Sequence, residues 1–193
     1  VLTVLPVIFA TAVYNINSLI DVGVFTRAME FFGKLAQKTP EKIADEAAGL
    51  YGLYSGTYIL LTNLPIAISN SLSSSLIPNI SKHMAARDIR SVHRKIRMAL
   101  KFSMIIAVPS SIGLSILATP IVRLLFRMED ASMVPIAIGL IKYGSFSVIF
   151  FSLSTVTNGI LQGSGRMSRP LINAVFSLVI HLAALFAFLY VFK

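Results

Sequence analysis

The sequence predicts an all-α membrane protein with five transmembrane helices. Hydrophobic residues make up 55% of the chain and charged residues only 13%, whereas a soluble domain carries about a quarter charged residues. The charges are also clustered, and none lies between Gly49 and Asn79. Finally, the apolar stretches are long enough for a helix to cross a hydrocarbon core of about 30 Å, which takes about 20 residues.

The five predicted spans are Val1–Phe25, Leu50–Pro78, Met98–Phe126, Val134–Leu161 and Pro170–Phe192. Membrane β-strands are disfavoured because they alternate polar and apolar residues over segments of about ten residues. Buried helices of a large soluble protein are the remaining alternative. Charge-free runs of this length are instead the signature of transmembrane helices.

Helix-start and helix-stop residues mark the ends of these elements. Thr39-Pro40 provides an N-cap and a proline at the first helical position, so the second helix begins before the bilayer. Ala118-Thr119-Pro120 predicts a break near the end of the third span, followed by a short amphipathic segment. Gly163-Ser164-Gly165 ends the fourth helix, and Ser168-Arg169-Pro170 opens the fifth.

The distribution of Lys and Arg predicts the orientation in the membrane. The loop 79–97 is basic and amphipathic, and from 79 to 101 seven basic residues accompany one acid, Asp88. The amphipathic loop 27–48 has equal numbers of bases and acids. Because cytoplasmic loops accumulate Lys and Arg, the Val1 end of this multi-pass protein is predicted to be cytoplasmic.

Both loops also place apolar residues at helical spacing, so we expect an interfacial helix in each, lying along the bilayer surface. Nucleic-acid binding is the competing interpretation of a basic run. It is disfavoured because the loop 79–97 is tied to the membrane on both sides and lacks interleaved aromatic residues. The predicted partner of this loop is therefore the lipid bilayer and not a nucleic acid.

Polar residues fall on one face of four of the five predicted helices. The four faces contain Tyr14, Asn17, Ser18 and Asp21; Asn63, Asn70 and Ser74; Thr155, Asn158 and Gln162; and Asn173, Ser177 and His181. Such faces need either a partner helix or a hydrated cavity. The predicted cavity residues are Asn17, Asp21, Asn63, Asn70, Asn158 and Gln162. The alternative is interhelical hydrogen bonding, with close packing permitted by Gly52, Gly56, Gly113 and Gly159.

Three ionisable residues within the spans have more than one interpretation. Asp21 is the only acid inside a span, where it either has a functional role, reaches water or pairs with Arg27. His181 is either a proton-relay group or a packing donor. Lys142 lies off the polar face of its helix and can extend its ammonium group to the interface.

The sequence contains no catalytic constellation. It has no cysteine, no phosphate-binding loop and no zinc-protease or serine-hydrolase motif. We therefore expect no enzymatic activity, no catalytic residue, no metal site and no cofactor.

Five segments occur in an order that resembles a known family: Asn63-Leu64-Pro65, Ser74–Ser81, Val108–Leu114, Ala118–Phe126 and Gly159–Gly165. Together they resemble the polysaccharide-flippase branch of the multidrug/oligosaccharidyl-lipid/polysaccharide (MOP) exporter superfamily. Within that branch the chain is most similar to the stage V sporulation protein B group of Firmicutes, which is similar to the lipid II flippases.

The resemblance implies a MATE-like transporter of twelve to fourteen helices, of which this chain is a fragment covering about helices seven to eleven, the start of the second lobe. It implies a flippase of the bacterial cytoplasmic (inner) membrane that moves a polyprenyl-pyrophosphate-linked saccharide or peptidoglycan precursor across that membrane by alternating access. The rest of the parent transporter and the lipid-linked substrate are then its partners. In lipid II flippases cationic cavity residues meet the pyrophosphate, whereas the polar faces here are mainly neutral.

Three other functions stay open at this point. A cation-coupled multidrug antiporter of the MATE type is the main alternative, in which Asp21 is the cation-linked acid and a coupling cation is a further partner. A membrane-bound transferase requires clustered acids or a catalytic histidine near an interface, and neither is present. A non-transporting scaffold is the last alternative.

Overall fold

The computed structural model describes residues 5–126 and 131–191, and every regular element in these ranges is helical. The predicted cytoplasmic position of Val1 lies outside the described residues. The helices are α1 (Leu5–Leu35), α2 (Pro40–Leu53), the π-helix η1 (Tyr54–Ile59), α3 (Leu60–Ala85), α4 (Ile89–Ile116), α5 (Ala118–Leu125), α6 (Met133–Gly144), α7 (Ser147–Gly163) and α8 (Ser168–Val191). The all-α fold class is confirmed.

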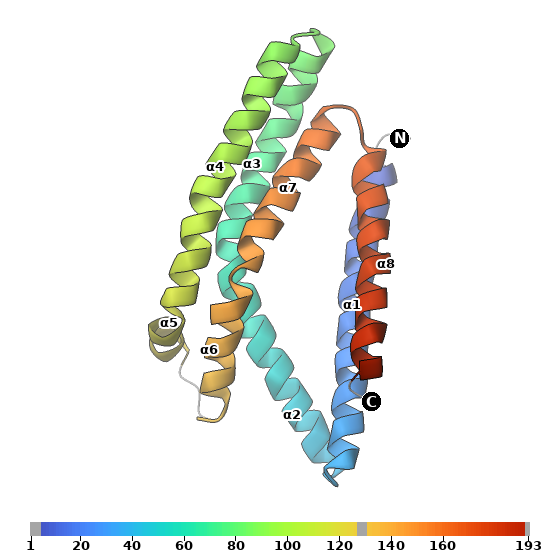
Figure 1. The fold of residues 1–193 in the computed structure, drawn as a ribbon, viewed down its shortest axis with the longest axis vertical. Helices are drawn as coiled ribbons and strands as arrows, with labels where there is room; N and C mark the ends of the chain where they lie inside the picture. The colour runs from blue at the N-terminus through green and yellow to red at the C-terminus, as the bar shows by residue number, and fades with distance from the viewer. Residues whose placement is uncertain (1–4, 127–130, 192–193) are drawn as a thin grey trace.

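The helices form two packed units (Figure 1). In one unit α3 and α7 run in the same direction and α4 packs against both in the opposite direction. In the other unit α1 packs along α8. The path through α2 and η1 joins α1 to α3 at one end of the molecule, and the short turn between α7 and α8 joins the units at the other end.

The predicted helix ends agree with the structure at four places. α2 begins at Pro40, although the side chain of Thr39 makes no capping hydrogen bond. The third predicted span breaks at Leu117, between α4 and α5. α7 ends at Gly163 and α8 begins at Ser168. Local residue chemistry therefore determines these boundaries.

The two predicted loops are mostly helical, because the flanking helices run through them. Only residues 86–88 separate α3 from α4, and only residues 36–39 separate α1 from α2. Arg87 and Gln37 each have φ 55°, the left-handed conformation that reverses the chain after a helix. The apolar and basic residues of both loops therefore lie on the ends of longer helices and not on separate ones. Their position at the bilayer surface stays a prediction.

The fourth predicted span is two helices instead of one. α6 and α7 meet at an angle of 46°. At the bend the phenol oxygen of Tyr58 lies 2.7 Å from Oγ of Ser147 and donates a longer hydrogen bond to the carbonyl of Gly144. Ser145 Oγ also donates to the carbonyl of Lys142. Contacts with a helix distant in sequence thus stabilise a bend that no proline marks.

Three of the described helices are long and apolar enough to cross a membrane, namely α1, α4 and α8, and the bent pair α6–α7 makes a fourth if it is one span. The predicted span Leu50–Pro78 is not among them. Its main helix, α3, has 26 residues and is about 39 Å long at 1.5 Å per residue, which is long enough to cross a membrane. The reason is therefore its composition, which is less apolar. α3 is rich in Ser and Asn, and its crossing of the membrane stays a prediction.

Two glycines set the close approach of α7 to α3. A methyl group on Gly159 would meet the side chain of Ser73 and lie 3.1 Å from the carbonyl oxygen of Ser73. A methyl group on Gly163 would lie 2.9 Å from the carbonyl oxygen of Ile77. Close packing at Gly159 is therefore confirmed. At Gly52, Gly56 and Gly113 no atom of another described helix lies within 4 Å of the added methyl group, so the described residues show no close packing there.

The turn between α3 and α4 contains a side-chain cap that depends on pH. Oδ1 of Asp88 accepts a hydrogen bond of 3.0 Å from the backbone N–H of Ser91 at the start of α4. Hydrogen bonds from Ser91, followed by the charge of His83, lower the pKa of the Asp88 carboxyl. A carboxyl whose pKa is lower in the folded state stabilises the fold above its unfolded pKa, and this stability is lost as pH falls through the folded pKa.

We expect Asp88→Ala to lower the hydrogen-exchange protection of the first amides of α4, because the orphan N–H groups lose their acceptor. In the unchanged protein the same protection should fall as pH is lowered through the depressed pKa. Asp88→Asn is the matched control, since an asparagine still caps and does not titrate. Equal protection in the Ala and Asn variants would show that the cap does not stabilise this turn.

Candidate functional site

Asp21 of α1 and His181 of α8 form a hydrogen bond between the two helices of the smaller unit. Nε2 of His181 lies 2.6 Å from Oδ1 of Asp21. The His181 side chain is 39% exposed and the Asp21 side chain 52% exposed in this chain by itself. The sequence placed each residue on a polar face, but it offered water or Arg27 as the partner of Asp21. The structure corrects this, because the partner is on a helix 160 residues away.

Asp21 also borders a cavity of about 370 Å³ between α1, α2, η1 and α6. The walls of this cavity are mainly apolar, and its polar groups come from Ser18, Asp21, Tyr51 and Tyr54. Asp21 is the only charged residue among the described residues that line it. The carboxylate therefore lies between an apolar cavity on one side and the imidazole of His181 on the other.

Asn17 lies one helical turn before Asp21. Its Oδ1 atom is buried and has no hydrogen-bond partner among the described residues. A buried acceptor without a partner costs about 1–3 kcal/mol. Asn17 and Asp21 thus form a polar spot on α1 in which one oxygen is paired and one is not.

The other four predicted cavity residues share one face of the pair α3–α7. Leu76 of α3 and Val156 of α7 pack in one cluster with Val92 and Ala99 of α4. At 100° per residue, the four amides lie on the opposite side of the α3–α7 contact from α4. We call them the amide face, which consists of Asn63, Asn70, Asn158 and Gln162.

The side chains of the amide face are partly exposed and form no hydrogen bond between α3 and α7 in the described residues. Asn63 and Asn70 are exposed, and Asn158 and Gln162 are half-buried. Within the described ranges, none of the four side chains makes a hydrogen bond to another helix. The structure therefore brings these four residues onto one surface, whereas Asn17 and Asp21 lie on the other unit.

Interhelical hydrogen bonds come instead from serines that lie outside the four predicted polar faces. Oγ of Ser69 lies 3.3 Å from Oγ of Ser103, which joins α3 to α4. Ser73 donates to the carbonyl of Thr155 and Ser81 to the carbonyl of Gly163, both at 3.0 Å. Ser115 of α4 donates to the carbonyl of Lys142 at 2.8 Å.

One sequence signal indicates the contact between α3 and α7. Gly159 and Gly163 are four residues apart, the spacing that allows two membrane helices to approach closely. Ser69 and Ser73 repeat the same spacing on α3. The serines and glycines of α3 and α7 thus have a packing role, and the residues of the amide face are not needed for this packing.

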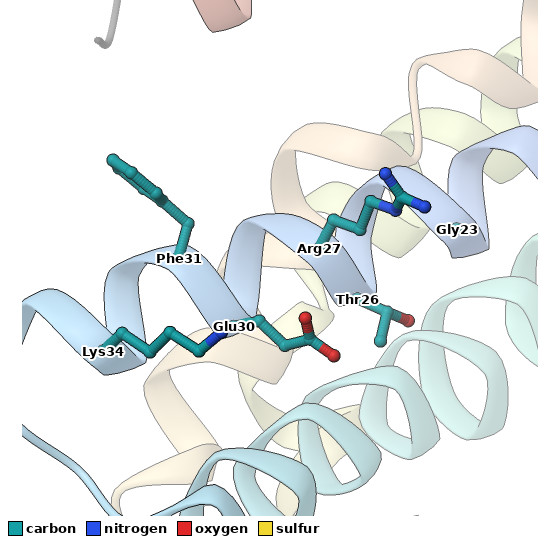
Figure 2. A pocket seen from close by; sticks show the side chains of 6 residues that line it. All are labelled: Gly23, Thr26, Arg27, Glu30, Phe31 and Lys34. Atoms are coloured by element: carbon teal, nitrogen blue, oxygen red, sulfur yellow. The ribbon is translucent and has the colours of Figure 1, made fainter.

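Two charged features lie apart from these polar groups. Lys142 is exposed and its Nζ lies 5.7 Å from the centre of the Tyr143 ring. A hollow of about 650 Å³ runs along the C-terminal half of α1, and all its lining residues belong to that helix. Figure 2 shows Arg27, Glu30 and Lys34 along this part of α1. In the described residues, no group of three or more His, Asp or Glu side chains is placed to hold a metal ion.

Comparison with known proteins gives one family and two curated relatives. The family model described as "Lipid II flippase MurJ" matches residues 3–193. The chain is 23% identical to the lipid II flippase MurJ of Bacillus subtilis (strain 168) over 178 residues, which cover 92% of this chain and 31% of that protein. It is 28% identical to the uncharacterized membrane protein YabM of the same organism over 129 residues, or 67% of this chain and 23% of that protein.

The chain thus spans less than a third of the length of these relatives. No solved structure matches it.

Proposed function

Because the chain belongs to the lipid II flippase MurJ family, we propose that it is the first part of the second lobe of a longer flippase. That flippase moves a polyprenyl-pyrophosphate-linked saccharide or peptidoglycan precursor outward across the bacterial cytoplasmic membrane by alternating access. The observation that carries this proposal is the family match over residues 3–193. The finer relationship to the sporulation branch of the superfamily is part of the same proposal.

The amide face supports a transport role for α3 and α7. Unpaired amides facing hydrocarbon are costly, since lipid offers no hydrogen bonds. A water-filled path satisfies them and lets them hydrogen-bond to the hydroxyl and phosphate groups of a passing headgroup. We propose that Asn63, Asn70, Asn158 and Gln162 line this path, together with Asn17 and Asp21 from α1.

The two packed units support alternating access. The larger unit has dense contacts between α3, α4 and α7, and the smaller unit consists of α1 and α8. Transporters of this type work by rocking one bundle against another. The links through α2 and through the α7–α8 turn lie at opposite ends (Figure 1), which suits a rocking motion of one unit against the other.

A reconstituted transport assay tests the function directly. The full-length flippase that contains this chain is placed in proteoliposomes with a fluorescent polyprenyl-pyrophosphate-linked disaccharide. An impermeant quencher then measures how much of the substrate crosses to the other leaflet. Crossing that depends on the protein is expected, whereas crossing no faster than in protein-free vesicles would reject the proposal. A drug-cation substrate in the same vesicles tests the antiporter alternative.

The orientation is tested by cysteine labelling. The turns after α3 and α7 lie at the same end of the molecule (Figure 1), and both carry basic residues. Cysteines replacing Arg90 and Arg166 should be shielded from an impermeant thiol reagent in intact cells, while one replacing Lys38 should react. The chain has no cysteine of its own. Reaction at Arg90 with protection at Lys38 would reverse the proposed orientation.

A further inference from the structure

A groove of about 340 Å³ lies between α3 and α4, and we call it the α3–α4 groove. Its lining includes two polar and four long apolar side chains, namely Asn79, Lys95, Leu72, Leu76, Met98 and Phe102. Met98 is 59% exposed and Phe102 is 52% exposed, so the groove opens on the outer surface of the two helices. Because α4 is a candidate membrane span and α3 packs against it, this surface meets lipid unless another part of the parent protein covers it.

The polar and apolar residues of the groove lie at different depths. Asn79 is six residues before the end of α3, and Lys95 is six residues after the start of α4. Each is therefore about 9 Å from the turn between the helices, at 1.5 Å per residue. Leu72 and Phe102 lie seven residues further from that turn, or about another 10 Å. With the turn at the membrane surface, as its basic residues predict, the groove has an ammonium and an amide near the surface and apolar walls below them. A phospholipid has the same order, with a phosphate above its acyl chains.

Lys95 is half-buried and makes no ion pair in the described structure. In α3, α4 and the turn between them the only acid is Asp88. Its carboxylate already accepts a hydrogen bond from Ser91 and lies 3.4 Å from Nδ1 of His83. A partly buried ammonium without a counter-ion is unfavourable, because it has lost part of its hydration and no opposite charge compensates. An anion that is not part of these helices removes this cost.

We propose that the α3–α4 groove binds an anionic phospholipid of the membrane, with the lipid phosphate at Lys95 and an acyl chain along Leu72 and Phe102. The ammonium of Lys95 donates hydrogen bonds to the phosphate. Nδ2 of Asn79 carries two hydrogens, and the carbonyl of Ser75 takes one of them, so the other can also bind the phosphate. This inference goes beyond the transport function and does not depend on it, since lipid binding needs no substrate.

The surrounding charge favours an anionic lipid over a zwitterionic one. From 79 to 101 the chain has seven basic residues and one acid. A Lys or Arg near the membrane surface attracts anionic lipid by about 1 kcal/mol, whereas the cationic group of a zwitterionic lipid is repelled by the same surplus of positive charge. The amide face lies on the opposite side of the α3–α7 contact from α4. The groove is therefore separate from the proposed path of the lipid-linked precursor.

Quenching of an introduced tryptophan measures the occupancy of the groove. Met98→Trp is made in the full-length flippase, which is placed in phosphatidylcholine nanodiscs with a rising fraction of phosphatidylglycerol that is brominated on its acyl chains. Bromine quenches a tryptophan that it contacts, and the signal is the difference from the protein without the added tryptophan. Half-maximal quenching should need about fivefold less brominated phosphatidylglycerol than brominated phosphatidylcholine, the factor that corresponds to about 1 kcal/mol.

Phe176→Trp is the matched control for the position of the tryptophan. Phe176 is 68% exposed and lies eight residues into α8, as Met98 lies nine residues into α4. Both helices start at the same end of the molecule (Figure 1), so the two tryptophans have similar depths. The control tryptophan should be quenched equally by the two brominated lipids, because no groove with a lysine lies beside it.

Two further variants separate the groove from the general charge of the surface. In the Met98→Trp protein, Lys95→Gln should remove the fivefold preference for phosphatidylglycerol. Arg97→Gln also removes one positive charge from this part of α4, but position 97 is 200° from position 95 around the helix at 100° per residue. It should keep the preference. Equal losses in the two variants would show a general attraction of lipid to the basic surface and would overturn the proposal.

Three other results would also overturn it. Equal quenching of the Met98→Trp protein by the two lipids would mean that the groove does not select an anionic lipid. Quenching by neither lipid would mean that another part of the parent protein covers the groove. Displacement of brominated phosphatidylglycerol by an equal amount of the lipid-linked precursor would assign the groove to the substrate. None of these results decides whether the protein flips the precursor, because no transport is measured.

Discussion

Replacing Gly159 by alanine should lower the stability of the full-length flippase by about 1–3 kcal/mol, because the added methyl group overpacks the α3–α7 contact. The methyl group would meet the Ser73 side chain and the Ser73 carbonyl oxygen, which belongs to the backbone of α3 and cannot turn away. It would also displace the hydroxyl that Ser73 donates to Thr155. The gain of about 1 kcal/mol from alanine in a helix opposes these losses and is smaller.

Thermal unfolding in detergent measures this loss of stability, and Gly113→Ala is the control variant. Gly113 is also inside a long helix, but nothing in the described structure lies within 4 Å of its added methyl group. That variant should be neutral or more stable by up to about 1 kcal/mol. Adding Ser73→Ala to Gly159→Ala should restore part of the stability by removing the side-chain clash. Equal melting temperatures for the Gly159 and Gly113 variants would contradict the close α3–α7 contact.

Changing the amide face should affect transport and leave the fold intact. In the double variant Asn70→Leu with Asn158→Leu, one amide is removed from each of α3 and α7. We expect the flipping rate to fall at least about tenfold, which corresponds to about 1.4 kcal/mol of lost interaction with the moving headgroup. The melting temperature should stay the same, because neither side chain makes a hydrogen bond to another helix in the described structure.

Ser75→Leu is the matched control for this experiment. Ser75 is also an exposed polar residue of α3, but it lies on the side of that helix toward α4 and off the amide face. It should transport at the normal rate. If the double variant flips substrate normally, or if its activity falls only because less folded protein is present, the four amides do not line the transport path.

The sequence determined the features that depend on neighbouring residues. Pro40 at the first position of α2 and Gly165 after α7 mark these boundaries. Proline lacks an N–H, and glycine adopts the left-handed φ of 76° found at Gly165 without strain. The same is true of the polar faces, since the helical repeat alone places Asn158 and Gln162 on one side of α7. The basic residues near Arg90 and Arg166 likewise indicated that the two turns lie at one end of the molecule, as they do in the structure (Figure 1).

Only the tertiary structure decided which faces meet. The bend between α6 and α7 depends on Tyr58, which is far away in the sequence. The pairing of Asp21 with His181 depends on α8 packing along α1, and no local sequence feature indicates a histidine instead of water as the partner of Asp21. The physical reason is range: helix starts and stops are set by bonds within a few residues, whereas hydrogen bonds and close approaches between helices depend on the geometry of the whole bundle.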